Sequence, residues 1–266
     1  LDVVFWRCVF GTGTLLLVCA AFGFLRPGVI SRTAVLLAIA SGVAIVGNWL
    51  LLFASYSRAS IAIGTAVYNV QPFMLVGLAA VFLGEKITAA KVTWLSVAFM
   101  GMLAIVSAHG AGQTGGSEYL LGIALALGAA FLYAIAALII KRLAGIPPHL
   151  IALIQVATGV LLLAPWVKLG GLPGESSALA SLVTLGMVHT GLMYVLLYSA
   201  IQRLPTALTG ALSFVYPIAA ILVDWVAFGH RLAPLQWLGV ALILLAAAGM
   251  QQGWWFRSHA VVTKGQ

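Results

Sequence analysis

Residues 239–248 have the sequence GVALILLAAA, a run of ten positions without a polar side chain. A helix needs about 20 mainly apolar residues to cross the hydrocarbon core of a bilayer. Working outward from this run, we place nine segments of that kind at residues 3–25, 33–55, 61–83, 91–108, 119–140, 149–168, 178–200, 206–228 and 235–253. A transmembrane β-barrel would instead show short strands in which apolar and polar residues alternate. The sequence therefore predicts an all-α integral membrane protein.

The overall composition excludes several other classes of protein. Hydrophobic residues make up 63% of the chain and charged residues only 7%, whereas a soluble domain carries roughly 25% charged residues. This rules out a soluble enzyme, a disordered chain and a nucleic-acid-binding domain, despite the net charge of +8. No His, Cys, Asp or Glu spacing is typical of a metal site. We therefore expect a protein embedded in the lipid bilayer that is not an enzyme, with no catalytic residues, metal or cofactor.

The basic residues predict the orientation in the membrane. With nine spans, the Lys and Arg residues divide nine to four between the two sides, and the cytoplasmic side carries the excess in membrane proteins. This places the C-terminus in the cytoplasm. The nine residues expected on that side are Arg26, Arg32, Lys86, Lys91, Lys141, Arg142, Arg203, Arg257 and Lys264.

The chain matches itself at an offset of 145 residues. Segment 48–105 aligns without gaps on segment 193–250, with nine of 58 positions identical. The placement of the matches is more informative than their number, because Pro72 and Pro217 both fall near mid-helix. Since the aligned positions lie on opposite sides of the membrane, the pattern predicts an inverted repeat, a plan common among secondary transporters.

The repeat divides the chain into four parts. We expect a first repeat at residues 1–109, a Gly-rich linker at 110–117, a second repeat at 118–253 and a C-terminal tail at 254–266. The second repeat holds five predicted helices and the first holds four. We therefore expect a tenth helix before Leu1 in the full chain.

Two motifs carry a resemblance to a known family. One is Phe82–Thr88, FLGEKIT, which closes a long Pro-containing helix, and the other is Gln236–Gly239, QWLG, early in the last helix. With the tandem five-helix units, they resemble the EamA family of the drug/metabolite transporter superfamily. Within it the chain is most similar to the YddG-type aromatic amino-acid exporters. It departs from the family pattern at His230, where a Glu is usual, and at Trp94, where Gly is frequent.

The resemblance implies a fold, a location and a pathway. Such proteins have ten helices in two inverted five-helix repeats and lie in the bacterial inner membrane. The resemblance also implies that the substrate pathway is lined by the helix expected before Leu1 and by the segments 33–55, 61–83, 119–140, 178–200 and 206–228. The sequence leaves the oligomeric state open, a monomer included.

Several candidate site residues lie near the predicted bilayer centre. Pro72 and Pro217 each remove a backbone hydrogen bond and loosen their helix. This predicts either a broken, gating helix that exposes carbonyl groups to substrate or a simple packing kink. Aromatic residues on these and the other expected pathway helices suit a flat apolar solute. They are Trp49, Tyr68, Tyr133, Tyr194 and Tyr198, of which Tyr198 fits an interfacial aromatic belt equally well.

Polar side chains near the same depth complete the candidate substrate site. Asn48 lies beside Trp49, and Asn69 and Gln71 lie close to Tyr68 in the sequence. These amides, together with Ser213 near Tyr216, could hold the charged groups of a zwitterion or could join helices. His189 is the one ionisable side chain near the predicted midplane, where it could respond to protons or be a neutral structural group.

These residues predict a secondary transporter. We expect it to export small zwitterionic or neutral metabolites, with aromatic or apolar amino acids favoured, by alternating access, either as a uniporter or by proton antiport. The alternative is a proton-coupled exporter of drugs or cations, in which Asp224 would take part. Arg7 lies near the outer end of its predicted span, and the absence of a basic cluster disfavours anionic substrates.

Overall fold

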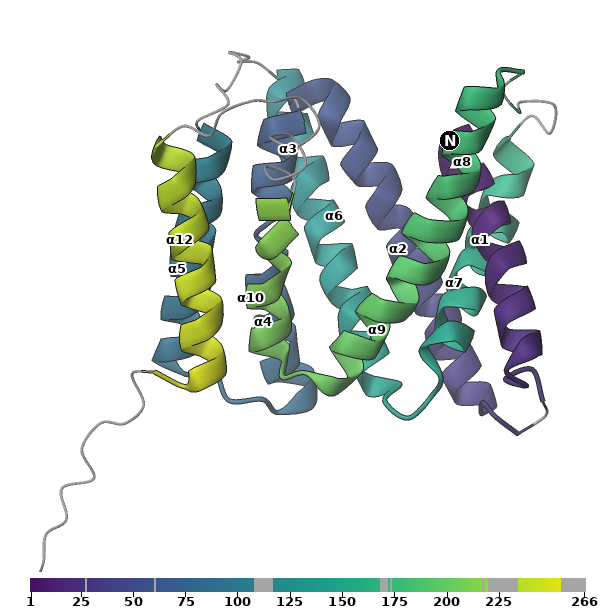
Figure 1. Ribbon diagram of the computed structural model, residues 1–266, viewed down its shortest axis with the longest axis horizontal. Coiled ribbons are helices and arrows are strands. Elements are labelled where there is room, and N and C mark those ends of the chain that lie inside the picture. Colours follow the sequence, from purple (N-terminus) through teal and green to yellow (C-terminus); the bar gives the residue numbers. More distant parts are fainter. Residues whose placement is uncertain are drawn as a thin grey trace, which may run out of the picture.

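The protein is described by a computed structural model that covers residues 1–26, 28–59, 61–107, 117–167, 172, 174–216, 218–219 and 234–254. All regular structure in these ranges is helical (Figure 1). The helices are α1 (Asp2–Ala21), α2 (Arg32–Ala59), α3 (Ile61–Tyr68), α4 (Gln71–Leu83), α5 (Ala89–Ser107), α6 (Ser117–Arg142), α7 (Pro148–Leu163), η1 (Ala164–Trp166), α8 (Ser176–Gly186), η2 (Met187–Leu192), α9 (Met193–Arg203), α10 (Thr206–Ser213) and α12 (Pro234–Gln252).

Several helical stretches are long and apolar enough to cross a membrane. Within the described ranges six helical stretches meet that criterion, and two shorter apolar helices lie in α5 and α12. Apolar side chains also cover much of the outer surface, as on Leu17, Leu161 and Val81. A lipid-facing surface has this composition because there is no water to solvate polar groups. The prediction of an all-α integral membrane protein is confirmed.

The helix bounds repeat at the offset found in the sequence. Moving α5 forward by 145 residues gives 234–252, the bounds of α12. The same shift moves α2 to 177–204, one residue from the continuous helix Ser176–Arg203 formed by α8, η2 and α9. Figure 1 shows that the paired elements run in opposite directions, α2 rising from the lower edge and α8–α9 descending to it. Opposite directions are what an inverted repeat requires.

A break interrupts the helical stretch that contains Pro72. Helix α3 ends at Tyr68 and α4 begins at Gln71, with Pro72 in the first turn of α4. Proline suits this place because it has no N–H group to donate to the preceding turn. The helix is therefore interrupted where the sequence predicted a break or a kink, and the gating role of Pro72 stays a prediction. Helix α10 ends at Ser213, which is 145 residues after Tyr68, but Pro217 itself lies outside the described residues.

Glycines allow two pairs of helices to cross closely. A Cβ atom on Gly42 of α2 would lie 2.9 Å from the Cα of Gln155 in α7. A Cβ atom on Gly186 of α8 would lie 2.4 Å from the Cβ of Phe10 in α1. Small residues at such crossings let helices in membranes gain close packing contacts. The two crossings join equivalent helix pairs, so both halves of the molecule use the same packing.

A buried chain of hydrogen bonds ties four helices together, α2, α6, α7 and α9. Gln155 of α7 donates from Nε2 to Ser41 Oγ in α2 at 2.6 Å, and Ser41 Oγ donates to the carbonyl oxygen of Ala136 in α6 at 3.3 Å. The Tyr198 hydroxyl of α9 donates to Oε1 of Gln155. Ser41, Gln155 and Tyr198 are all at most 1% exposed. Since a buried polar group needs a partner, each of these side chains depends on the others.

We expect Gln155→Leu to lower the melting temperature of the protein in detergent, because it leaves the Tyr198 hydroxyl without a partner and removes one of the two hydrogen bonds of the Ser41 hydroxyl. A buried polar group without a hydrogen-bond partner lowers the free energy of unfolding of soluble proteins by about 1–3 kcal/mol, and values for membrane proteins lie at the low end. Tyr198→Phe removes one of the same bonds. The double variant should therefore be more stable than the sum of the single losses predicts. Simple additivity in the thermal melts would contradict the shared network.

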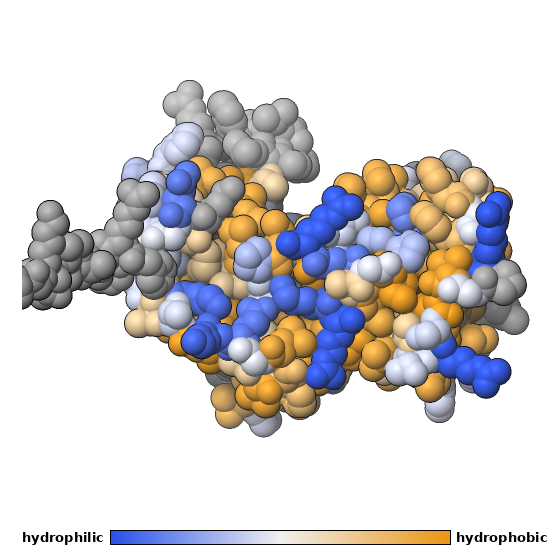
Figure 2. Space-filling model, turned by 90° about the horizontal axis from the view of Figure 1, so that it is seen from below, coloured by the Kyte–Doolittle hydropathy of each residue, from blue (hydrophilic) through white to orange (hydrophobic). Residues whose placement is uncertain are grey.

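Exposed basic residues gather at one end of the bundle. They lie where α1, α4, α6 and α9 end and α2 begins, and Figure 2, viewed from below, shows hydrophilic side chains spread across this face. The exposed residues at this end are Arg26, Arg32, Lys86, Arg142 and Arg203. All of them are among the residues predicted to lie on the cytoplasmic side.

Candidate substrate site

The centre of the candidate site is a contact between Trp49 of α2 and Tyr194 of α9. Trp49 Nε1 donates to the Tyr194 hydroxyl at 3.0 Å, and the rings meet edge to face with centroids 5.7 Å apart. Each residue is 6% exposed. They are 145 residues apart, so they are equivalent positions of the two repeats. Equivalent residues touch only beside the two-fold axis that relates them, and in an inverted repeat this axis lies in the membrane plane.

A second aromatic pair lies next to the first. Asn48 donates from Nδ2 to the Tyr68 hydroxyl at 3.3 Å and to the Ala129 carbonyl at 2.8 Å. The Tyr68 and Tyr133 rings meet edge to face with centroids 6.2 Å apart. Both rings are only partly buried. The structure thus brings five predicted residues into two contact groups that start from consecutive residues of α2, Trp49 with Tyr194 and Asn48 with Tyr68 and Tyr133.

Tyr198 has a different environment from the other tyrosines. Its ring packs edge to face on Tyr194 at 5.2 Å between centroids. Its hydroxyl, however, donates to Gln155 in the buried network between helices. The structure therefore places Tyr198 in the helix packing behind Tyr194. The belt interpretation requires an exposed ring, which Tyr198, at 1% exposure, does not have.

Arg7 belongs to this cluster, although the sequence did not predict it there. Its guanidinium carbon lies 4.0 Å from the centroid of the Trp49 ring and 5.9 Å from that of Tyr194. Its Nε donates to Thr190 Oγ1 at 2.7 Å, and its side chain is 8% exposed. A single charge in an apolar run is the signal that could have found it. The expectation that Arg7 lies near the outer end stays a prediction, and the position of a residue along a helix does not show which helices its side chain faces.

The residue that holds Arg7 lies in a turn of π-helix. Element η2 spans Met187–Leu192, and Thr190 Oγ1 donates to the Leu185 carbonyl five residues earlier at 2.9 Å. A π turn holds one residue more than an α turn and is frequent at functional sites. One extra residue shifts the repeat offset to 144 before η2, which matches Gly42 with Gly186. The two close crossings therefore lie at equivalent glycines, and η2 is a local insertion in the second repeat.

The remaining predicted polar residues are distributed more widely. Asn69 donates to the Thr65 carbonyl at 2.8 Å and Ser213 to the Gly210 carbonyl at 2.7 Å, each within its own helix. Gln71 is 6% exposed and its Oε1 has no hydrogen-bond partner among the described residues. The His189 side chain and Tyr216 are exposed. His189 contributes its backbone carbonyl, which accepts from Arg7 at 3.5 Å.

The two halves also meet at the basic end of the bundle. Glu85, directly after α4, accepts from the Thr206 hydroxyl and lies 3.7 Å from Lys141 Nζ at the end of α6. Lys141 also donates to the Leu204 carbonyl at 2.7 Å. In the sequence this turn stands out only as a family motif. The contacts show that its Glu joins the first repeat to the second.

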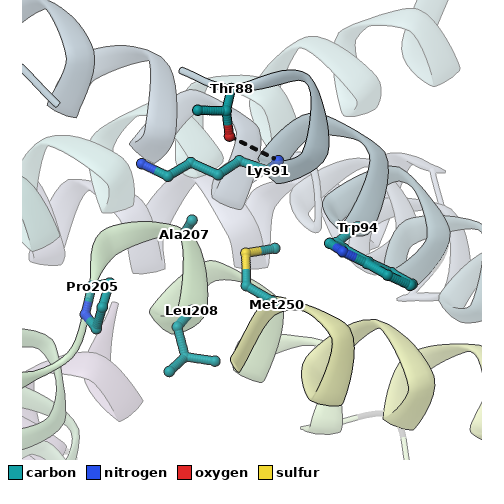
Figure 3. A pocket seen from close by; sticks show the side chains of 7 residues that line it. All are labelled: Thr88, Lys91, Trp94, Pro205, Ala207, Leu208 and Met250. Carbon is teal, nitrogen blue, oxygen red and sulfur yellow. Dashed lines mark hydrogen bonds between the residues drawn. The ribbon is translucent and has the colours of Figure 1, made fainter. Parts of the chain in front are cut away.

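A pocket of about 340 Å³ opens at the same end, between α5, α10 and α12 (Figure 3). It is lined by Thr88, Lys91, Trp94, Pro205, Ala207, Leu208 and Met250, none of which was predicted as a site residue. In the parts of the chain that the structure describes, no three His, Cys, Asp or Glu side chains are grouped so that they could hold a metal ion.

The architecture defines a membrane protein of the secondary-transporter type, with antiparallel repeats and an aromatic cluster beside their axis. Residues 1–107 and 120–251 match the EamA-like transporter family, and the chain belongs to this family. The resemblance found in the sequence is confirmed. Because the members of this family are transporters, the expectation that the protein is not an enzyme is confirmed as well.

Relatives and a solved structure agree with this assignment. An uncharacterised transporter, YxxF of Bacillus subtilis, is 30% identical over 251 residues, which are 93% of this chain and 79% of the relative. A probable terminal-alkyne amino-acid exporter of Streptantibioticus cattleyicolor is 28% identical over 190 residues, or 71% of this chain and 64% of the relative. A crystal structure with 20% identity has the same fold, with a TM-score of 0.80 over 94% of this chain and 86% of its own.

Proposed function

We propose that the protein exports small zwitterionic or neutral metabolites, aromatic and large apolar amino acids above all, by alternating access. The observation that carries this proposal is the buried Trp49–Tyr194 contact between equivalent residues of the two repeats. A solute bound beside the two-fold axis contacts both halves, so rocking of one half against the other exposes it to either side. Aromatic faces and edges in this place suit a flat apolar side chain.

Two further observations support an amino acid as the substrate. Polar groups lie around the aromatic cluster, with the free Oε1 of Gln71 as an acceptor near Tyr68 in the sequence. One relative is named a probable amino-acid exporter. Both favour a zwitterion with an apolar side chain over a wholly apolar solute. The candidate residues for binding are therefore Asn48, Trp49, Tyr68, Gln71, Tyr133 and Tyr194, with Pro72 and Pro217 as candidate gating residues.

The coupling mechanism that we propose is uniport. Among the described residues, no Asp or Glu is buried within a spanning helix. A proton-coupled carrier needs an ionisable group that both states can reach. We further propose that the protein lies in the bacterial inner membrane with its basic end, and hence its C-terminus, in the cytoplasm.

Uptake into proteoliposomes tests the function. We expect the full-length protein to take up phenylalanine, tryptophan and methionine in a saturable manner and well above alanine and glutamate, without a proton or sodium gradient. Preloading the vesicles with phenylalanine should accelerate uptake, because a carrier exchanges solutes and a channel does not. Failure to transport any of these amino acids would overturn the proposal. Transport of lipophilic cations that requires a proton gradient and is lost in Asp224→Asn would favour a drug exporter instead.

A further inference from the structure

We propose that Arg7 binds the carboxylate of the transported solute, while the side chain of that solute packs against Trp49 and Tyr194. This inference rests on the proposed function and names the chemical group that the site requires. It makes Arg7 the residue that selects amino acids, and carboxylates in general, over amides and cations.

The charge of Arg7 has no acidic partner in the described structure. Glu85 lies next to Lys141, and Glu118 lies 3.2 Å from Arg58 at the opposite end of the bundle. Asp2 and Glu175 are exposed at the starts of their helices. The fifth acid, Asp224, lies outside the described residues. A charged side chain that is only 8% exposed inside a membrane helix bundle is costly and marks a functional site whose partner is to be identified.

The contacts of Arg7 orient the guanidinium without neutralising it. Thr190 Oγ1 and the His189 carbonyl accept from Nε and from one terminal nitrogen, the second at the long distance of 3.5 Å. The Tyr194 hydroxyl also interacts with it. All three partners are uncharged dipoles. Arginine has five N–H groups, two more than these three contacts use, and its planar fork matches the two oxygens of a carboxylate.

The stacking on Trp49 favours the same arrangement. A guanidinium whose carbon lies 4.0 Å from the ring centroid lies over the ring, so one of its faces is covered by the indole. The N–H groups point outward in the guanidinium plane and are not used by such a contact. A carboxylate can therefore bind at the edge while the indole remains in place. This puts the carboxylate next to the Trp49–Tyr194 pair, where the aromatic side chain of the same solute would pack.

The π turn η2 explains how the Arg7 guanidinium is held in place. Element η2 places Thr190 at the Arg7 Nε, and Thr190 is itself fully buried. The equivalent part of the first repeat, in α2, is regular helix. The two halves therefore differ where Arg7 is held. A fixed cation with its orienting bonds already made loses little freedom when the carboxylate binds.

Binding of three related probes tests this proposal. We would measure the affinity of purified full-length protein for phenylalanine, phenylalaninamide and 3-phenylpropionate, together with the melting temperature without ligand. The wild-type protein should prefer phenylalanine to the amide by at least about tenfold, since a charge-assisted hydrogen bond is worth roughly one to two powers of ten in affinity. Arg7→Met should lose this preference, and Arg7→Lys should keep part of it because the charge remains without the fork.

Arg58→Met is the matched control. Arg58 is paired with Glu118 outside the cluster, so its replacement should leave the ratio of acid to amide affinity unchanged. A wild-type ratio in Arg7→Met would overturn the proposal. If Arg7→Met does not fold, a wild-type ratio in Arg7→Lys would do the same. A higher ratio in Asp224→Asn would show that this acid already neutralises Arg7, and would also overturn it.

The outcomes separate this proposal from the proposed function. The protein could bind 3-phenylpropionate in a way that depends on Arg7 and neither bind nor take up phenylalanine. This result would support the carboxylate site and refute the proposal of an amino-acid exporter. Uptake of phenylalanine with an unchanged acid-to-amide ratio in Arg7→Met would keep the exporter and refute the carboxylate site. A loss of all three affinities in equal measure, with a lowered melting temperature, would show that Arg7 only supports the fold.

Discussion

Trp49→Ala is expected to abolish phenylalanine uptake. The change removes the hydrogen bond and the edge contact with Tyr194, and it also removes the ring on which Arg7 lies. Truncating a buried Trp costs about 3–5 kcal/mol, and an aromatic pair adds about 0.5–1.5 kcal/mol beyond the buried area. Uptake by proteoliposomes and thermal melting, measured on the same preparation, separate the loss of transport from the loss of stability.

Two further variants separate the effect of Trp49 on transport from its effect on stability. Trp49→Phe keeps most of the ring but has no N–H group, so the melting temperature should largely recover while uptake remains well below wild type. Trp237→Ala is the control, because Trp237 is 60% exposed on α12. It should change neither quantity strongly. Uptake at the wild-type rate in Trp49→Ala would refute the site at the repeat axis.

The repeat is the most informative feature of the sequence. The offset of 145 residues matches Trp49 with Tyr194, and in the structure these two side chains touch. The reason is geometric, since an inverted repeat brings equivalent residues together along its axis. The helix break at Pro72 could be predicted for a local reason, because proline lacks the N–H group that continues a helix.

The orientation of individual side chains could not be predicted in the same way. The position of His189 along the chain predicts a place at the midplane, but its side chain is exposed and the buried neighbour Thr190 makes the contact with Arg7. The π turn η2 decides which of these two side chains faces Arg7, because one extra residue in a turn rotates the following residues about the helix axis. Nothing in the apolar sequence around Met187–Leu192 indicates a π turn. Hydrophobic periodicity is uninformative where lipid and protein interior are both apolar.

The position of Arg7 shows a second limit. Its distance from the start of α1 suggests a place near the membrane surface, where an arginine extends to water. Helix α1 packs against α7 and α8, and the close approach at Gly186 brings Arg7 to Trp49. This contact depends on how two helices cross, which a single sequence does not contain. The same applies to Tyr198, whose partner Gln155 lies on another helix.

Gly186→Ala is expected to lower both stability and transport. The new Cβ would lie 2.4 Å from the Phe10 Cβ, 3.1 Å from the Arg7 carbonyl oxygen and 3.1 Å from the Gly11 nitrogen. Two of these three atoms are backbone, so α1 must move away from α8. Such overpacking costs about 1–3 kcal/mol. The melting temperature in detergent should fall clearly.

Gly13→Ala is the matched control for this change. Gly13 lies on the same helix as Phe10, and a Cβ atom there would meet nothing within 4 Å. Since alanine is favoured over glycine inside a helix by about 1 kcal/mol, the melting temperature should stay the same or rise. An equal fall in Gly13→Ala and Gly186→Ala would contradict a close crossing of α1 and α8.

The equivalent glycine of the first repeat separates packing from function. In Gly42→Ala the new Cβ would lie 2.9 Å from the Gln155 Cα and 3.0 Å from the Thr158 Cβ, so a comparable loss of stability is expected. Only the crossing at Gly186 contains the backbone of Arg7, because Gly186 directly precedes η2 and faces that residue. Phenylalanine uptake, compared at equal amounts of folded protein, should therefore fall further in Gly186→Ala than in Gly42→Ala. Equal uptake by the two variants would show that the position of α1, and of the cation it carries, is unimportant for transport.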